Sequence, residues 1–104
     1  CAQLVTEGIA LGIVSPAQFP SLLHVGNDKL DSVHKVILYT DGFTDVRNKE
    51  DEIYVAERLL KTINKSKRQP AKEMLKSIIS EVDQFRQKTE YTDDSTMIIL
   101  ENLL

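Results

Sequence analysis

The chain has 104 residues, enough for one domain with a modest core, and its 41% hydrophobic and 28% charged residues are ordinary for a soluble globular protein. The formal net charge of −3 gives no electrostatic footprint for nucleic acid, and no apolar run is long enough to span a bilayer, so neither nucleic acid nor a membrane is an expected partner. Cys1 is the only cysteine, which excludes a disulfide within the chain and favours a reducing, cytoplasmic location.

The first third of the chain is predicted to be largely extended. Residues 4–14 are apolar with two glycines, Gly8 and Gly12, which indicates a strand or a pair of short extended segments joined by a tight bend. Residues 21–25 are a short strand candidate between two polar segments. Residues 34–40 (HKVILYT) predict a further strand. Its apolar run lacks a clean alternation, which is typical of a strand that is buried on both faces.

Two helices and a closing strand are predicted next. In the first helix, apolar residues recur at helical spacing, at Ala56, Leu59, Leu60 and Ile63. Residues 64–69, rich in Lys, Ser and Asn, break this helix, and Pro70 suits the first turn of a second, longer helix that we expect to end near Lys88. This helix carries a long apolar stripe: Ala71, Met74, Leu75, Ile78, Ile79, Val82 and Phe85. Residues 89–94 predict a polar loop, and residues 95–103 predict the closing strand.

Acidic residues stand where two of the predicted strands end and begin. Asp41 directly follows the strand at residues 34–40, and Asp93 and Asp94 come just before the closing strand. If these strands are antiparallel neighbours, the end of one lies beside the start of the other, and the acids come close together. Mg²⁺ or Mn²⁺ suits such carboxylates, and two ions can activate a bridging water for in-line attack on a phosphate. The Asp-Gly pair is also a common turn dipeptide, so this segment by itself leaves a plain turn open.

Four segments in this order resemble a known family. They are GIALGI at residues 8–13, LYTDG at residues 38–42, its continuation DGFTDVRN at residues 41–48, and TDDST at residues 92–96. Asp41 and Asp93 are 52 positions apart, with two predicted helices between them. The set resembles the C-terminal half of the metal-dependent PPM/PP2C protein phosphatases, and more closely their bacterial stress-response and sporulation branch.

The resemblance implies an α+β fold: part of a PPM-type α-β-β-α sandwich, with a mostly antiparallel sheet and two helices on one face. It implies that Asp41 and Asp93 are metal ligands and that the complete domain holds two Mn²⁺ or Mg²⁺ ions. Asp45 stands where related enzymes can place a carboxylate toward a third, loosely held metal, although the helix dipole also favours an acid in a first helical turn. The remaining matched positions imply a backbone turn beside the metal or support of the ligands without direct coordination: Gly42, Asp94 and Thr96.

The implied activity is hydrolysis of phosphoserine or phosphothreonine on a protein, an anti-sigma factor antagonist in this branch. A water that bridges the two metals would attack the phosphate, and no catalytic side chain beyond the metal ligands is implied. Two alternatives stay open. The chain could be a non-catalytic, phosphatase-like binding or sensor module. TDGFTD at residues 40–45 superficially resembles the Asp-Gly-Thr motif of the haloacid-dehalogenase phosphatases, but these enzymes need a nucleophilic Asp two positions before Asp41, where this chain has Tyr39.

The chain departs from the family pattern in two places and lacks one part of it. Val33 and His34 replace a frequent Gly-Asp pair, and Ala10 replaces a Pro; these changes touch a turn and a bend. The family's N-terminal metal ligand, with its Gly-His-Gly segment, would precede residue 1. Since the chain opens on Cys1 rather than Met, we expect residues 1–104 to be the C-terminal portion of a longer phosphatase domain. Alone, it should be inactive and should self-associate through uncovered sheet edges and apolar faces.

Overall fold

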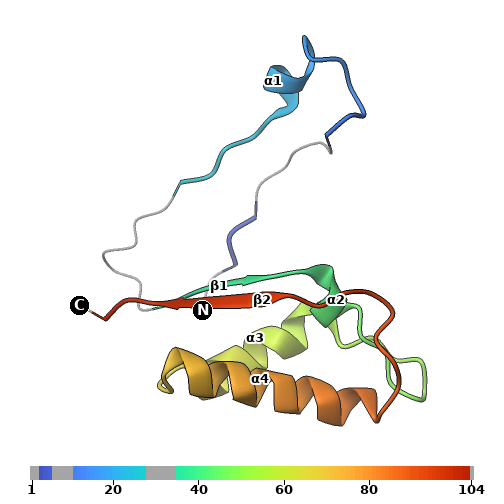
Figure 1. The fold of residues 1–104 in the computed structure, drawn as a ribbon, viewed down its shortest axis with the longest axis vertical. Helices are drawn as coiled ribbons and strands as arrows, with labels where there is room; N and C mark the ends of the chain where they lie inside the picture. Colours follow the sequence, from blue (N-terminus) through green and yellow to red (C-terminus); the bar gives the residue numbers. More distant parts are fainter. Residues whose placement is uncertain (1–2, 6–10, 28–34, 104) are drawn as a thin grey trace. The chain divides into compact units, whose positions relative to one another are not determined.

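The computed structural model describes residues 3–5, 11–27 and 35–103, and the chain divides near residue 31 into two compact units. The described elements, in chain order, are α1 (Phe19–Leu22), β1 (Lys35–Tyr39), α2 (Asp41–Thr44), α3 (Val55–Ser66), α4 (Ala71–Arg86) and β2 (Met97–Glu101) (Figure 1). This is a mixed α+β composition. No helix among the described residues is long and apolar enough to cross a membrane.

The N-terminal unit contains no strand among its described residues. Residues 11–14 form a turn and a bend, with Gly12 at φ +82°, and the middle of the strand predicted at residues 4–14 lies outside the described residues. The strand predicted at residues 21–25 is wrong, because α1 covers its first two residues and the rest is irregular. Pro20 is the second residue of α1, in the first turn, where its missing N–H costs nothing. The short apolar run had no periodicity that could separate a helical turn from a strand.

The sheet of the C-terminal unit pairs β1 with β2, as predicted. The strands are antiparallel, with Ile37 opposite Ile99 and Tyr39 opposite Met97. These four side chains share one face and pack against the core. The core itself is built mainly from the apolar faces of the helices and from the segment after β1: Phe43, Val46, Tyr54, Leu59, Ile63, Met74, Ile78 and Val82.

Helices α3 and α4 lie on the same side of this sheet (Figure 1). Their buried apolar residues recur every four positions, as the sequence predicted: Leu59 and Ile63 on α3, and Met74, Ile78 and Val82 on α4. Helix α3 also buries the polar residues Thr62 and Ser66. Helix α3 extends through Ser66, three residues into the segment predicted to break it. Helix α4 ends at Arg86, followed by Gln87 in the left-handed region, close to the predicted end at Lys88.

The opposite face of the sheet is apolar and exposed. Leu38 is 53% exposed, and its neighbours Ile98 and Leu100 on β2 are 50% and 53% exposed. The prediction that β1 is buried on both faces is therefore wrong for the described residues. The continuous apolar run reflects a sheet with two apolar faces, of which the helices cover one.

One contact between the sheet and α4 replaces an ordinary helix cap. Pro70 precedes α4 and offers no side-chain cap, but Glu101 Oε2 accepts a hydrogen bond from the Ala71 N–H at 3.1 Å. Glu101 Oε1 also lies 3.4 Å from Lys35 Nζ on the paired strand. The Ala71 N–H, and then Lys35, lower the pKa of the Glu101 carboxyl. The end of β2 thus stabilises the positive N-terminus of α4.

Candidate metal site

The end of β1 and the start of β2 are held together beyond the strand ladder. The Thr40 N–H donates to the Thr96 carbonyl at 3.0 Å, and the Thr96 N–H donates to Thr40 Oγ1 at 3.0 Å. Thr40 Oγ1 also lies 3.4 Å from the Asp94 carbonyl and can donate its proton there. The residue after β1 therefore aligns the loop before β2, and the juxtaposition expected from antiparallel pairing is present.

Asp41 is the first residue of the one-turn helix α2. From the sequence alone, a plain turn was also possible at this position. The Asp45 N–H donates to the Asp41 carbonyl at 2.8 Å, and Thr44 Oγ1 donates to the same oxygen at 3.2 Å. Asp41 and Asp45 are both exposed. The turn of helix brings their backbones together, four positions apart on one face.

Gly42 is where the two segments come closest. A Cβ added to this buried glycine would lie 2.1 Å from the Asp94 carbonyl oxygen and 2.8 Å from Ser95 Oγ. Only a residue without a side chain allows this approach. Asp41 is joined directly to Gly42, and Asp93 directly to Asp94, so the two predicted ligands flank the contact.

The loop before β2 presents its acids to solvent. Asp93 and Asp94 are exposed, and Asp93 Oδ1 accepts a hydrogen bond from the Asp94 N–H at 2.8 Å. This bond restricts the Asp93 side chain and leaves its second oxygen for another partner. The backbone of Thr96 joins the strand ends, while a supporting role for its side chain stays a prediction.

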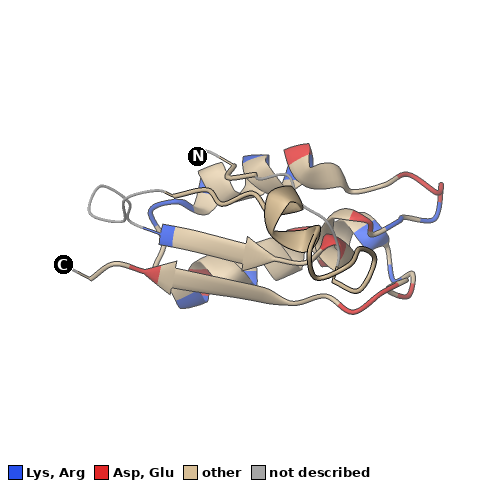
Figure 2. Ribbon diagram, turned by 90° about the horizontal axis from the view of Figure 1, so that it is seen from above, with Lys and Arg blue, Asp and Glu red and all other residues tan. Residues whose placement is uncertain are grey.

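The donor set at this end of the sheet fits a hard divalent cation but is incomplete. Carboxylate oxygens from separate segments are what Mg²⁺ and Mn²⁺ take. Beside them, Ser95 Oγ is buried and has no hydrogen-bond partner among the described residues. No three His, Cys, Asp or Glu side chains of the described part of the chain are grouped closely enough to hold one ion. Acidic residues nevertheless gather along the loops at this end (Figure 2).

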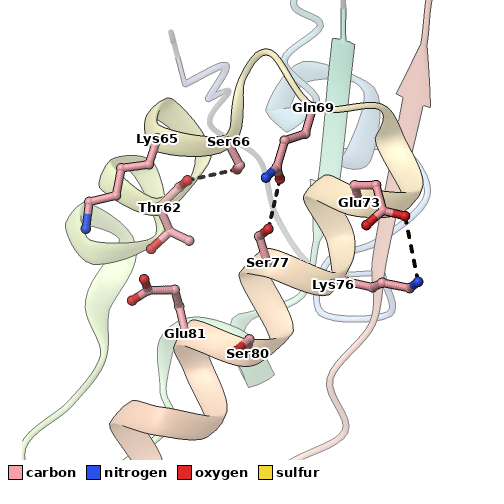
Figure 3. A pocket seen from close by; sticks show the side chains of 9 residues that line it. All are labelled: Thr62, Lys65, Ser66, Gln69, Glu73, Lys76, Ser77, Ser80 and Glu81. Atoms are coloured by element: carbon pink, nitrogen blue, oxygen red, sulfur yellow. Dashed lines mark hydrogen bonds and ion pairs between the residues drawn. The ribbon is translucent and has the colours of Figure 1, made fainter.

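A polar groove of about 400 Å³ lies elsewhere, between α3 and α4 (Figure 3). None of the predicted site residues lines it. Several of its side chains are already paired. Gln69 Oε1 accepts a hydrogen bond from Ser77 Oγ at 2.8 Å, and Lys76 Nζ lies 3.7 Å from Glu73 Oε1. The hollow is therefore separate from the chemistry predicted for the sheet end.

Sequence reasoning missed the residues that hold the loop before Asp93. Arg86 donates through Nε to Asp83 Oδ1 at 2.8 Å, and its guanidinium carbon lies 4.8 Å from the centre of the Tyr91 ring. Burial, and then the nearby Asp83, raise the pKa of Tyr91. Asp83 and Arg86 stand three positions apart on a predicted helix, which signals an ion pair, but no sequence pattern signals the contact with Tyr91.

The sequence of nearly the whole chain matches a known protein family. The family model of stage II sporulation protein E (SpoIIE) matches residues 1–102. No curated protein matches the chain, and no solved structure does. Because the family match covers nearly all of the sequence, the chain belongs to the stage II sporulation protein E (SpoIIE) family, and membership of this family implies a PPM-type serine/threonine phosphatase.

Proposed function

We propose that residues 1–104 form the C-terminal portion of a metal-dependent phosphatase domain in which Asp41 and Asp93 are metal ligands. The observation that carries the proposal is the close approach of Gly42 to the Asp94 carbonyl, which leaves the two acids at one end of the sheet. The family match supports the phosphatase class. The substrate we propose is a phosphoserine or phosphothreonine protein of the anti-sigma factor antagonist kind.

Each residue at the sheet end has a proposed part. Asp41 and Asp93 hold Mn²⁺ or Mg²⁺, and Gly42 lets their segments meet. Asp94 contributes its backbone to the contact, and Asp45 is positioned for a third, weaker ion. When bound, the divalent ions supply an activated water and neutralise the negative charge of the phosphate. In this proposal, the remaining ligands come from a portion of the domain that precedes this chain.

Carboxylate substitutions in the full-length parent protein test the proposal. Asp41→Asn or Asp93→Asn should reduce Mn²⁺-dependent release of phosphate from a phosphoserine protein by at least about 100-fold, since residues that merely support a metal ligand already contribute about 10- to 100-fold. The fold should survive, because both side chains are exposed and Asn keeps an oxygen that can accept the hydrogen bond from the Asp94 N–H. Glu57→Gln is the matched control, an exposed acid on α3 that lies 3.8 Å from Lys61. Full activity in both Asp variants would remove these residues from the site.

The same experiment separates the enzyme from the alternative of a non-catalytic module. A parent protein that releases no phosphate at any Mn²⁺ concentration, while still binding the phosphoprotein, would establish the binding module. Metal-dependent release that is lost in Asp93→Asn but retained in Glu57→Gln would establish the phosphatase.

A further inference from the structure

Arg86 fixes the loop between α4 and β2 at two points. Its Nη1 donates to the Thr89 carbonyl, and its guanidinium lies over the ring of Tyr91, 4.8 Å from the centroid. Asp83 holds the other edge of the same guanidinium, and Tyr91 Oη reaches Asp83 Oδ1 at 3.4 Å. Only 24% of the Arg86 side chain is exposed, so its guanidinium is held by these contacts rather than surrounded by solvent.

The same loop is also tied to the segment that follows α2. Thr89 Oγ1 lies 2.7 Å from the Arg47 carbonyl and 2.8 Å from the Arg86 carbonyl, so its single proton serves one of them at a time. The Lys49 N–H donates to Gln87 Oε1 at 3.3 Å. Arg47 follows Asp45 by two positions, so these bonds connect the Asp93 loop to the segment that begins with Asp41.

Asp93 therefore stands between two anchored stretches. On its N-terminal side, Arg86 holds the chain at Thr89 and Tyr91; on its C-terminal side, Thr40 bonds the backbone of the next residues. We propose that Arg86 is a positioning residue, which holds the Asp93 carboxylate where it meets the metal. The inference rests on the proposed function, in which Asp93 is a ligand.

A simpler role for Arg86 has a different signature. A cation in the last turn of a helix is favoured by the helix dipole whatever its shape, and Lys supplies it as well as Arg does. Positioning needs the flat guanidinium, which can bond a carboxylate and a carbonyl along its edges while its face stacks on an aromatic ring. Arg86→Lys keeps the charge and removes the fork, so it separates the two roles.

The test uses Arg86→Lys and Thr89→Val in the full-length parent protein. Arg58→Lys is the matched control, because Arg58 also lies over a ring, 4.7 Å from the centre of Phe85, but its ion pair is with Glu52, outside the loop that contains Asp93. Mn²⁺ binding is measured by isothermal titration calorimetry. Amide hydrogen exchange is measured without metal at Thr89, whose N–H donates to the Arg86 carbonyl at 3.0 Å, and at Asp94, whose N–H donates to Asp93 Oδ1 at 2.8 Å. We expect Arg86→Lys to raise the Mn²⁺ dissociation constant by about 10-fold or more and to accelerate exchange at these two amides. Thr89→Val should act in the same direction by a smaller factor.

Activity and Mn²⁺ affinity together distinguish a displaced ligand from a lost one. Phosphate release at saturating Mn²⁺ should recover toward the wild-type kcat in Arg86→Lys, because the ligand is displaced and not removed. Unchanged Mn²⁺ affinity in both Arg86→Lys and Thr89→Val, or an equal loss in Arg58→Lys, would overturn the positioning role. If Asp93→Asn binds Mn²⁺ as tightly as wild type, the proposed function fails; if only Asp93→Asn is impaired, the function stands and the inference about Arg86 falls. Should Arg86→Lys not fold, Thr89→Val decides by the same two measurements.

Discussion

Gly42→Ala tests whether the contact between α2 and the loop before β2 is as tight as the structure has it. Two effects oppose each other. Replacing a helical glycine with alanine normally stabilises the helix by about 1 kcal/mol. Here the new Cβ would lie 2.1 Å from the Asp94 carbonyl oxygen, whereas ordinary contact begins at 3.4 Å, so one segment must move by about 1.3 Å.

The clash should outweigh the helix gain. The obstructing atom belongs to the backbone, so no side-chain rotation relieves it. A shift of this size breaks the two bonds of 3.0 Å between Thr40 and Thr96, each worth about 1 kcal/mol. Overpacking adds about 1–3 kcal/mol. Subtracting the helix gain leaves a net loss of about 2 kcal/mol or more in the free energy of unfolding.

Urea unfolding of the 104-residue chain measures this loss, with wild type and variant compared at the same low protein concentration so that self-association does not shift the midpoint. Far-UV circular dichroism is the suitable signal because the chain has no Trp. For a slope of about 1–2 kcal/mol per molar urea, the midpoint should fall by roughly 1–2 M. Ser80→Ala, at an exposed position of α4, is the control and should shift stability by less than about 0.5 kcal/mol. A Gly42→Ala midpoint equal to or above that of the wild type would refute the close approach, and with it the placement of Asp41 beside the Asp93 loop.

Three further outcomes are expected. Ser95→Ala removes a buried hydroxyl that has no hydrogen-bond partner among the described residues, so the free energy of unfolding in urea should stay level or rise by up to about 1 kcal/mol; a loss of stability would reveal a partner for Ser95. The lowered pKa of Glu101 gives a stabilisation that is present above its ordinary value near 4.5 and is lost as the pH falls through the folded-state value. Glu101→Gln should therefore lose less stability than wild type between pH 7 and pH 3, and an equal loss would contradict this. Light scattering should show that the 104-residue chain self-associates, and a stable monomer at high concentration would contradict its reading as part of a domain.

The sequence predicted well those elements whose pattern follows directly from burial. The stripes of α3 and α4 recur at helical spacing because one side of each helix faces the core, where Leu59 and Ile78 are fully buried. The pairing of β1 with β2 was predictable from the order of elements and is confirmed by the register. That pairing brings the Asp41 and Asp93 segments together, while their roles as metal ligands stay predictions.

Other features have no local signal. The short apolar run at residues 21–25 fits a strand as well as a helical turn, and Leu23 at 52% exposure shows that no sheet packs over it in the described residues. The contacts of Arg86 with Thr89 and Tyr91 depend on how the chain turns after α4. The cap that Glu101 supplies to Ala71 spans 30 positions, a distance over which no capping pattern operates.

Helix α4 is hydrogen-bonded at both ends to the segment that follows it, residues 87–101. Glu101 holds its first residue, Arg86 holds the chain that leaves its last turn, and β2 runs between these two attachments. A helix of 16 residues is about 24 Å long and hardly changes its length, because every turn is closed by its own hydrogen bonds. The helix therefore behaves as a rigid rod, so a change in the spacing between the attachments at Ala71 and Thr89 would be taken up by the loop that contains Asp93 rather than by the helix.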